Sequence, residues 1–492
     1  MASAPTKSAS AQEAPSWPLA RPEYTSLAAA VQGEAARWNV PGMTVAVLHD
    51  GKIEEVATGI ASIATRQPVR TDSIFQIGSI SKVFAATLAM TLVDEGKLDL
   101  DEPVITYVPE LPFAGLPVRQ TITMRHLLSH SSGLEGDLFA NHGRGDDAAD
   151  RAITTLEHAT QWFNPGELYA YCNAGFYIVG LVTARLTGKT WEAALQERVL
   201  DPLKMEHTVL FADDAITRPH AIGHRLNARE DGFTIARPYW NLRHATPAGG
   251  VMSTAGDLLR FAQMHMNDGE LDGARVLKPE TAQLMRVPYI QAGIGESFYG
   301  QGWALDTHDG LMEIGHGGAT DGFRANLTAI PEKGFAIAQL TNGDPGRAAM
   351  QSIEEWALGH YLDHQRAEPE PITLKASELN AVSGLFSRHD STTSIVRDED
   401  RLIATIASID PDGGEAGQTQ TLTLVPIAPK KARAFRIPDG PYMGVIVEFI
   451  DSPTTDDPDR LLVRLGGRLS ARTGSAPRPK RARTTAKKAA KA

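Results

Sequence analysis

The sequence predicts an α+β fold, with an antiparallel sheet flanked by helices, a helical subdomain beside it and an all-β domain at the C-terminal end. Three observations support this prediction. Hairpin signals lie near residues 50 and 331, helical runs fill the region between them, and short alternating runs follow residue 372. Strands that are distant in sequence and separated by helices commonly meet in one antiparallel sheet.

The first predicted elements are a helix and a hairpin. Residues 25–40 space their apolar side chains along one face of a helix. Residues 43–62 predict two strands joined at Asp50-Gly51, a dipeptide typical of tight hairpin turns. A second helix is expected to begin near Ser79.

Helical runs dominate the middle of the chain, for example at 174–188 and 254–269. Strand signals return on both sides of a turn at 331–334, and a helix over 347–364 follows them. A helix and a hairpin therefore begin this region, and a hairpin and a helix end it. We therefore expect both ends of this region to contribute to one sheet.

Changes in composition divide the chain into four predicted segments. The expected boundaries are a disordered Ala/Ser/Pro-rich leader at 1–24, the α+β domain at 25–365, a β-barrel-like domain at 372–470 and a disordered basic tail at 471–492. The tail holds eight Lys or Arg and no acid, whereas the whole chain has a formal net charge of −11. An acidic body with a short basic tail predicts no specific nucleic-acid partner.

The sequence also argues against several kinds of protein. No apolar run approaches the ~18 residues of a membrane span, and no signal-peptide core is recognised, so a cytoplasmic location is expected. The single cysteine, Cys172, allows no intrachain disulfide. The histidines lack zinc-site spacing, so neither a metal nor a cofactor is predicted.

Two further kinds of site are excluded because their motifs are absent or incomplete. A serine hydrolase of the α/β type would carry G-x-S-x-G, which does not occur in the sequence. The triplet Gly188-Lys189-Thr190 ends like a phosphate-binding loop, but Thr183 stands where that loop needs its first glycine.

Ser79 and Lys82 are the first candidates for chemistry. They stand three residues apart, so a helix that begins at Ser79 places both on one face. A serine hydroxyl is a weak nucleophile that needs a base, and a lysine can act as that base when burial makes it neutral. The alternative is a serine that only caps a helix.

Tyr171 and Asn173 form a second candidate pair. They are two residues apart, so an extended segment would point both side chains the same way. The phenol could relay the serine proton, and the amide could hold Lys82 and a substrate carbonyl. The alternative is a polar loop before a helix, with Tyr171 in the core.

A glycine-rich stretch supplies the third candidate group, which comprises His316, Gly318 and Ala319. Glycines let a substrate backbone approach closely, and the N–H groups of Ala319 and Ser79 could form an oxyanion hole. His316 could bind a substrate carboxylate or support proton transfer. The alternative is a glycine-rich turn with a surface histidine.

Taken in order, these S-x-x-K, Y-x-N and H-x-G elements resemble the motifs of the serine β-lactamase and penicillin-binding protein superfamily, specifically its class C-like branch. Segments 124–134, 163–180 and 247–261 also resemble this family, so the likeness covers about 25–365. It implies a β-lactamase-like fold in which Ser79 is the nucleophile. It further implies that Lys82 and Tyr171 form the acid/base pair and that Asn173 positions the substrate.

The third motif carries a histidine where class C β-lactamases carry lysine. This departure favours an esterase or D-amino-acid peptidase that forms an acyl-enzyme with a small-molecule or short-peptide substrate. A β-lactamase, an acyltransferase and a non-hydrolytic penicillin- or peptide-binding sensor remain alternatives. The segment 372–470 resembles the lipocalin-like domains of some related hydrolases, which suggests that it shapes the active-site entrance. The sequence does not specify an oligomeric state.

Overall fold

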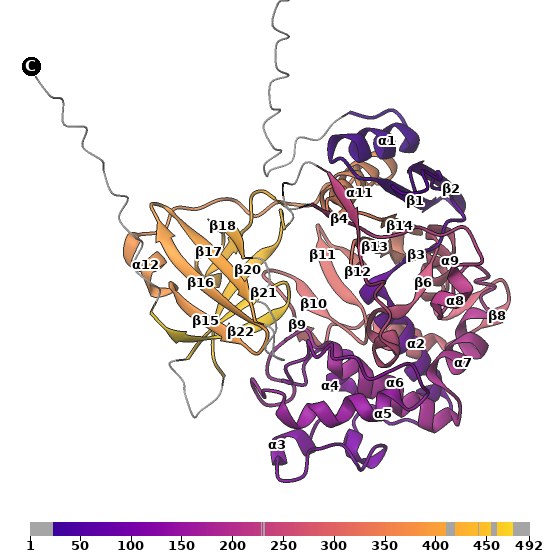
Figure 1. The fold of residues 1–492 in the computed structure, drawn as a ribbon, viewed down its shortest axis with the longest axis horizontal. Coiled ribbons are helices and arrows are strands. Elements are labelled where there is room, and N and C mark those ends of the chain that lie inside the picture. Colours follow the sequence, from indigo (N-terminus) through magenta and orange to yellow (C-terminus); the bar gives the residue numbers. More distant parts are fainter. Residues whose placement is uncertain are drawn as a thin grey trace, which may run out of the picture.

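A computed structural model of the chain describes residues 23–227, 229, 232–409, 419–440, 442–453 and 460–475 (Figure 1). Nearly all of the predicted leader, and the predicted tail beyond Ser475, lie outside these residues. The described residues form an α+β body and a closed β-barrel that lie side by side, so the predicted fold class is confirmed. In this described part, no helix has both the length and the apolar character needed to cross a bilayer.

Within the described residues, eight strands form one antiparallel sheet in the order β2-β1-β14-β13-β12-β11-β10-β9. The strands are β1 Gly42–His49, β2 Lys52–Gly59, β9 Ile290–Gln291, β10 Ser297–Tyr299, β11 Ala304–His308, β12 Leu311–Thr320, β13 Phe323–Ile330 and β14 Phe335–Thr341. Met43 in β1 pairs with Thr341 in β14. The two ends of the α+β region therefore join in one sheet, as the order of hairpins predicts.

Local sequence explains the two hairpins. Asp50 and Gly51 have φ values of 50° and 71°, which suit the two central residues of the tight turn between β1 and β2. Gly334 has φ 56° and ends the short helical turn between β13 and β14. Both glycines occupy the left-handed region that other residues enter at a cost.

Helices cover both faces of the sheet. Helices α1 (Leu27–Arg37) and α11 (Gly346–Leu362) pack together on one face, where they meet side chains such as Val45 and Val47. Ala46 and Leu48 point to the opposite face and join the larger core around α2 and α9. Because both faces are buried, β1 is an almost continuous apolar run.

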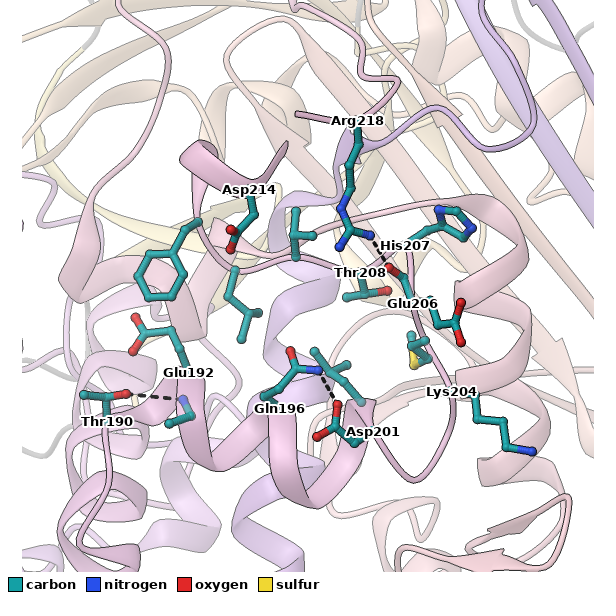
Figure 2. Close-up of a pocket in the computed structure, with 16 residues that line it drawn as sticks. Thr190, Glu192, Gln196, Asp201, Lys204, Glu206, His207, Thr208, Asp214 and Arg218 are labelled. Atoms are coloured by element: carbon teal, nitrogen blue, oxygen red, sulfur yellow. Dashed lines mark hydrogen bonds between the residues drawn. The ribbon is translucent and has the colours of Figure 1, made fainter. Parts of the chain in front are cut away.

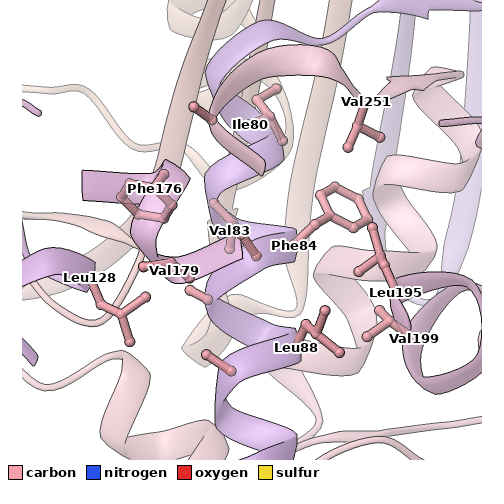
Figure 3. Close-up of a cluster of buried hydrophobic side chains, with 14 of the residues drawn as sticks. Ile80, Val83, Phe84, Leu88, Leu128, Phe176, Val179, Leu195, Val199 and Val251 are labelled. Atoms are coloured by element: carbon pink, nitrogen blue, oxygen red, sulfur yellow. The ribbon is translucent and has the colours of Figure 1, made fainter. Parts of the chain in front are cut away.

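Helix α2 (Ser81–Asp94) lies at the centre of the larger core (Figure 3). Nearly all of its side chains are buried, and the rings of Phe84 and Phe261 stack with their centroids 3.9 Å apart. A helix surrounded by other elements needs no polar face. The first turn of α2 carries Lys82, and its position in this core explains how a lysine comes to be buried.

The remaining helices and short strands complete the α+β body. The helices are α3 Pro117–Gln120, α4 Met124–Leu128, α5 Ala148–Ile153, α6 Asn173–Thr187, α7 Trp191–Leu195, α8 Ala212–Ala215, α9 Ala255–Met266 and α10 Pro279–Met285. The paired short strands are β3 Phe75–Gln76 with β6 Met252–Ser253, β4 His224–Leu226 with β5 Phe233–Ile235, and β7 Glu270–Leu271 with β8 Ala274–Arg275. Helices α3 to α6 gather at one end of the molecule as the predicted helical subdomain (Figure 1).

The C-terminal domain is a closed barrel in which eight strands are described, β15 to β22, preceded by α12 (Ala376–Ala381). The strands are β15 Gly384–Arg388, β16 Ser391–Asp398, β17 Arg401–Ser408, β18 Gln420–Ile427, β19 Ala434–Arg436, β20 Ile446–Asp451, β21 Leu461–Leu465 and β22 Arg468–Gly474. Alternate side chains such as Phe386, Leu424 and Phe449 fill the interior. Each strand pairs with its sequence neighbour, and β22 pairs with β15 to close the ring.

The last strand corrects the predicted start of the basic tail. Residues 471–474 pair with β15 and β21 and therefore belong to the barrel. The triplet Arg472-Thr473-Gly474, which the tail prediction included, lies in this strand. Basic and small residues gave no strand signal, whereas pairing on both sides provides the hydrogen bonds that hold them extended.

Candidate active site

Ser79 lies on a turn directly ahead of α2. A 3-10 turn spans Gly78–Ile80, so the α-helix begins at Ser81, two residues later than predicted. The Nζ of Lys82 lies 3.2 Å from the Ser79 Oγ and donates a hydrogen bond to the carbonyl of Ala248 at 2.5 Å. The structure therefore brings the first predicted pair into direct contact.

Burial determines the charge state of Lys82. Its side chain is inaccessible to solvent, and this desolvation lowers its pKa well below the ordinary value. The positive charge of Arg468 lowers the pKa further, while the carboxylate of Asp137 opposes the shift. The rings of Tyr171 and Phe176 lie 4.9 and 5.5 Å from the Nζ atom. Lys82 is therefore prepared to be a neutral amine.

Tyr171 is held between Lys82 and a buried histidine. Its ring centroid lies 4.1 Å from that of His130, whose Nδ1 accepts a hydrogen bond from the Cys172 backbone at 3.0 Å. Burial raises the pKa of Tyr171 above its ordinary value, and Arg468 and the Ser79 hydroxyl offset this only in part. The phenol is therefore protonated at neutral pH. Its hydroxyl has no hydrogen-bond partner of normal geometry in the described part of the chain.

Asn173 is the first residue of α6 and is almost fully buried. Cys172 caps this helix, since its Sγ accepts a hydrogen bond from the Gly175 backbone at 3.2 Å. The Asn173 Nδ2 donates a hydrogen bond to the carboxylate of Asp137 at 2.5 Å. The second predicted pair thus occupies the junction of a loop and a buried helix, next to the first pair.

His316 lies inside the protein rather than on its surface. Its Nδ1 is 2.6 Å from the Gly317 carbonyl, which can only accept, so Nδ1 carries the proton and Nε2 is an acceptor. Burial is the main cause that lowers the pKa of His316 to about 3. The imidazole is therefore neutral and offers no positive charge to a carboxylate. Its Nε2 is buried and unpaired among the residues that the structure describes.

Strand β12 presses against the turn that carries Ser79. A Cβ added to Gly318 would stand 1.9 Å from the Ile77 carbonyl oxygen, and one added to Gly78 would stand 2.5 Å from the Ala319 nitrogen. Backbones come this close only where side chains are absent. The backbone nitrogen of Ala319 therefore lies close to Gly78, the residue before Ser79.

The close approach at Gly318 predicts a large effect for a small substitution. In Gly318→Ala, the new methyl group forces β12 away from the Ser79 turn, so kcat/KM should fall at least about 100-fold. Gly317→Ala is the matched control, because its added Cβ would meet nothing closer than 3.9 Å. The kcat/KM of this control variant should stay within about threefold of that of the original protein. Equal losses in both variants would contradict this account of β12.

Four residues at the site were not singled out from the sequence. Ala248 and His130 belong to segments that resemble the family, but no role was assigned to either. Asp137 and Arg468 gave no signal at all, because their contact joins positions 331 residues apart. Only the fold reveals such long-range partners.

A separate cavity has no part in this site. A cavity of about 820 Å³ lies among α7, α8 and the loop between them, and it is lined by residues such as Thr190, Asp201 and Arg218 (Figure 2). Its walls mix acids and bases and include none of the candidate residues. Among the described residues, no group of three or more His, Cys, Asp or Glu side chains is placed to hold a metal ion.

Comparison with known proteins identifies a matching family and several relatives of this chain. The family model named Beta-lactamase matches residues 27–359. The chain is 36% identical to penicillin-binding protein 4 of Amycolatopsis lactamdurans, over 71% of this chain and 94% of that protein. It is 27% identical to a β-lactamase of Escherichia coli, over 62% of this chain and 84% of that protein.

Solved structures show the same fold. The crystal structure of SurE superposes with a TM-score of 0.68 at 24% identity and covers 91% of this chain and 98% of its own. The D-amino acid amidase of Ochrobactrum anthropi superposes with a TM-score of 0.56 at 24% identity, over 67% of this chain and 99% of its own. The resemblance inferred from the three motifs is confirmed.

Proposed function

The chain belongs to the beta-lactamase family, and from that membership we propose that it is a serine hydrolase that acts through an acyl-enzyme on ester or amide bonds. One observation carries the proposal more than any other. The Ser79 hydroxyl lies 3.2 Å from the amine of a lysine whose pKa is lowered well below its ordinary value by burial. A neutral amine at this distance can accept the serine proton, as a nucleophilic hydroxyl requires.

In the proposed acylation step, the Ser79 Oγ attacks the substrate carbonyl while its proton passes to Lys82. The backbone N–H groups of Ser79 and Ala319 stabilise the oxyanion. The protonated phenol of Tyr171 then supplies a proton to the leaving alcohol or amine, and Asn173 orients the substrate carbonyl. In the second step these roles are reversed. Water attacks the acyl-enzyme and gives a proton to the Tyr171 phenolate, protonated Lys82 returns its proton to the Ser79 Oγ, and the acid is released.

We assign the base role to Lys82 rather than to Tyr171. The pKa of the lysine is lowered and that of the tyrosine is raised, so at neutral pH the first can accept a proton and the second can donate one. Of the two groups, Lys82 is also the one with a hydrogen bond of normal geometry to the Ser79 Oγ.

The neutral state of His316 favours an esterase or D-amino-acid peptidase over a β-lactamase. Its Nε2 offers an acceptor to a substrate amide or hydroxyl, whereas a lysine at this position would offer a positive charge. The names of similar proteins, a penicillin-binding protein and a D-amino acid amidase, fit a short peptide or amino acid derivative as substrate.

A panel of chromogenic substrates tests the proposed function. We expect steady turnover of p-nitrophenyl acetate or butyrate, or of D-aminoacyl p-nitroanilides, with a higher kcat/KM than for nitrocefin. A burst of one equivalent followed by arrest would instead identify a binding sensor. Preferred hydrolysis of nitrocefin would identify a β-lactamase, and acyl transfer to an added amine at the expense of hydrolysis would identify an acyltransferase.

A further inference from the structure

The barrel packs directly on the segment that leads to Tyr171. Leu462, Leu469 and Ala471 on its outer face join one buried apolar cluster with Trp162 and Ala170 of the α+β body. This contact continues with polar groups, since Arg464 donates a hydrogen bond to the Tyr169 carbonyl at 3.3 Å. The barrel is therefore in contact with the segment that directly precedes the second motif.

A tight turn of the barrel reaches Tyr171 itself. Gly466 and Gly467 join β21 to β22 with φ values of 55° and 81°, as the two central residues of a short hairpin turn require. The Gly467 carbonyl accepts a hydrogen bond from the Tyr171 N–H at 2.8 Å. A Cβ on Gly467 would lie 3.0 Å from the Tyr171 Cβ, so a side chain at this position would crowd Tyr171.

Arg468 follows this turn and links two residues of the candidate site. Its guanidinium carbon lies 4.6 Å from the centre of the Tyr171 ring, a cation–π distance. Its Nε donates a hydrogen bond to Asp137 at 3.0 Å, and the other carboxylate oxygen of Asp137 accepts from Asn173. One barrel residue thus contacts the phenol directly and reaches the amide through a carboxylate.

The charge of Arg468 helps to keep the Asp137 carboxylate ionised. Burial alone would raise the pKa of Asp137, but Arg468 and Arg388, both in the barrel, outweigh it and lower the pKa to about 2. Asp137 is therefore an acceptor at every physiological pH. Because it holds the Asn173 Nδ2, it also fixes the direction of the amide oxygen.

We propose that Arg468 is a positioning residue through which the barrel completes the active site: it holds Tyr171 by its guanidinium and Asn173 through Asp137. The α+β body contains the motifs, but two of their side chains take their geometry from the barrel. This inference rests on the proposed function, since it assigns the barrel a part in the same site.

The test compares Arg468→Met with Arg460→Met in the full chain. Arg460 is a matched control, because it also lies on the barrel face against the α+β body and its guanidinium covers the Trp162 ring at 5.3 Å. The substrate is p-nitrophenyl acetate, which has no carboxylate, so any direct binding of a substrate anion by Arg468 is removed from the comparison. A Ser79→Ala variant gives the background rate.

Arg468→Met should lower kcat about 10- to 100-fold and change KM less than about threefold. The acid limb of the kcat/KM profile should move to higher pH, since loss of a nearby positive charge raises the pKa of Lys82. The other ionisable groups around Lys82 are His130, Asp137, Tyr171, Cys172 and His316. Arg468→Lys should recover part of kcat and most of the pH profile, and Arg460→Met should resemble the original enzyme.

Amide hydrogen exchange provides a readout that does not depend on activity. In Arg468→Met, peptides covering 132–140 and 168–176 should exchange faster, while Arg460→Met leaves them unchanged. Unchanged exchange, or equal effects of both variants on kcat and exchange, would overturn the positioning role. If the original enzyme shows no turnover that depends on Ser79, the proposed function fails, and the exchange data still decide whether Arg468 holds these segments.

Discussion

Replacing Ser79 with alanine should lower kcat/KM for every ester or amide substrate at least about 10⁴-fold. The hydroxyl is the atom that forms the acyl-enzyme, and no neighbouring group at this position can replace it. Steady-state rates with p-nitrophenyl butyrate, together with mass spectrometry of an acylated intermediate, measure the effect. Retention of more than about 1% of kcat/KM would exclude Ser79 as the nucleophile.

Ser81 is the matched control, because it belongs to the same short segment and has a different environment. Its Oγ donates a hydrogen bond to the Gly78 carbonyl at 2.7 Å and accepts one from the Val251 N–H at 3.0 Å. Ser81→Ala should therefore destabilise the fold by about 1–3 kcal/mol. Its kcat/KM should fall less than about tenfold. Loss of activity at Ser79 and loss of stability at Ser81 would separate chemistry from structure.

The parts of the fold and site that depend on neighbouring residues could be predicted from the sequence. The spacing of Ser79 and Lys82 is local, so one helical turn is enough to place them together. The hairpin at Asp50-Gly51 is equally local, because a two-residue turn depends on its own dihedral angles. Such features follow from the order of neighbouring residues alone.

Other features depend on contacts that sequence spacing does not encode. Arg468 meets Asp137 only because the barrel packs on the loop before Tyr171. The sequence could not show that His316 is neutral, because its burial lowers the pKa of the imidazole. Burial changes the chemistry of a side chain through desolvation, and only the packed fold determines that burial.

Lys82→Met is the second substitution with a large expected effect. Methionine has nearly the same length and apolar volume as lysine but no amine, so kcat/KM should fall at least about 10³-fold. The double variant with Ser79→Ala should be no less active than Ser79→Ala alone, since the two groups act in one proton transfer. A further large loss in the double variant would show that Lys82 acts independently of Ser79.

The same variant should change how stability depends on pH. The pKa of Lys82 is lowered in the fold, so between that pKa and about 10.4 the unfolded chain binds a proton that the folded chain does not. The free energy of unfolding therefore rises with pH in this window for the original enzyme, and this contribution is absent from Lys82→Met.

Thermal unfolding of both proteins at several pH values between 7 and 10 measures this difference. Loss of the amine leaves the Ala248 carbonyl without its donor, which costs about 1–3 kcal/mol at every pH. The test is therefore how the difference in Tm between the two proteins changes with pH, rather than its sign at one pH. The Tm of the original enzyme should rise relative to that of Lys82→Met as the pH rises. Only the original enzyme releases a proton from Lys82 on folding, and a higher pH favours that release. A constant difference would mean that Lys82 is charged in the folded protein, and a charged lysine could not take the proton from Ser79.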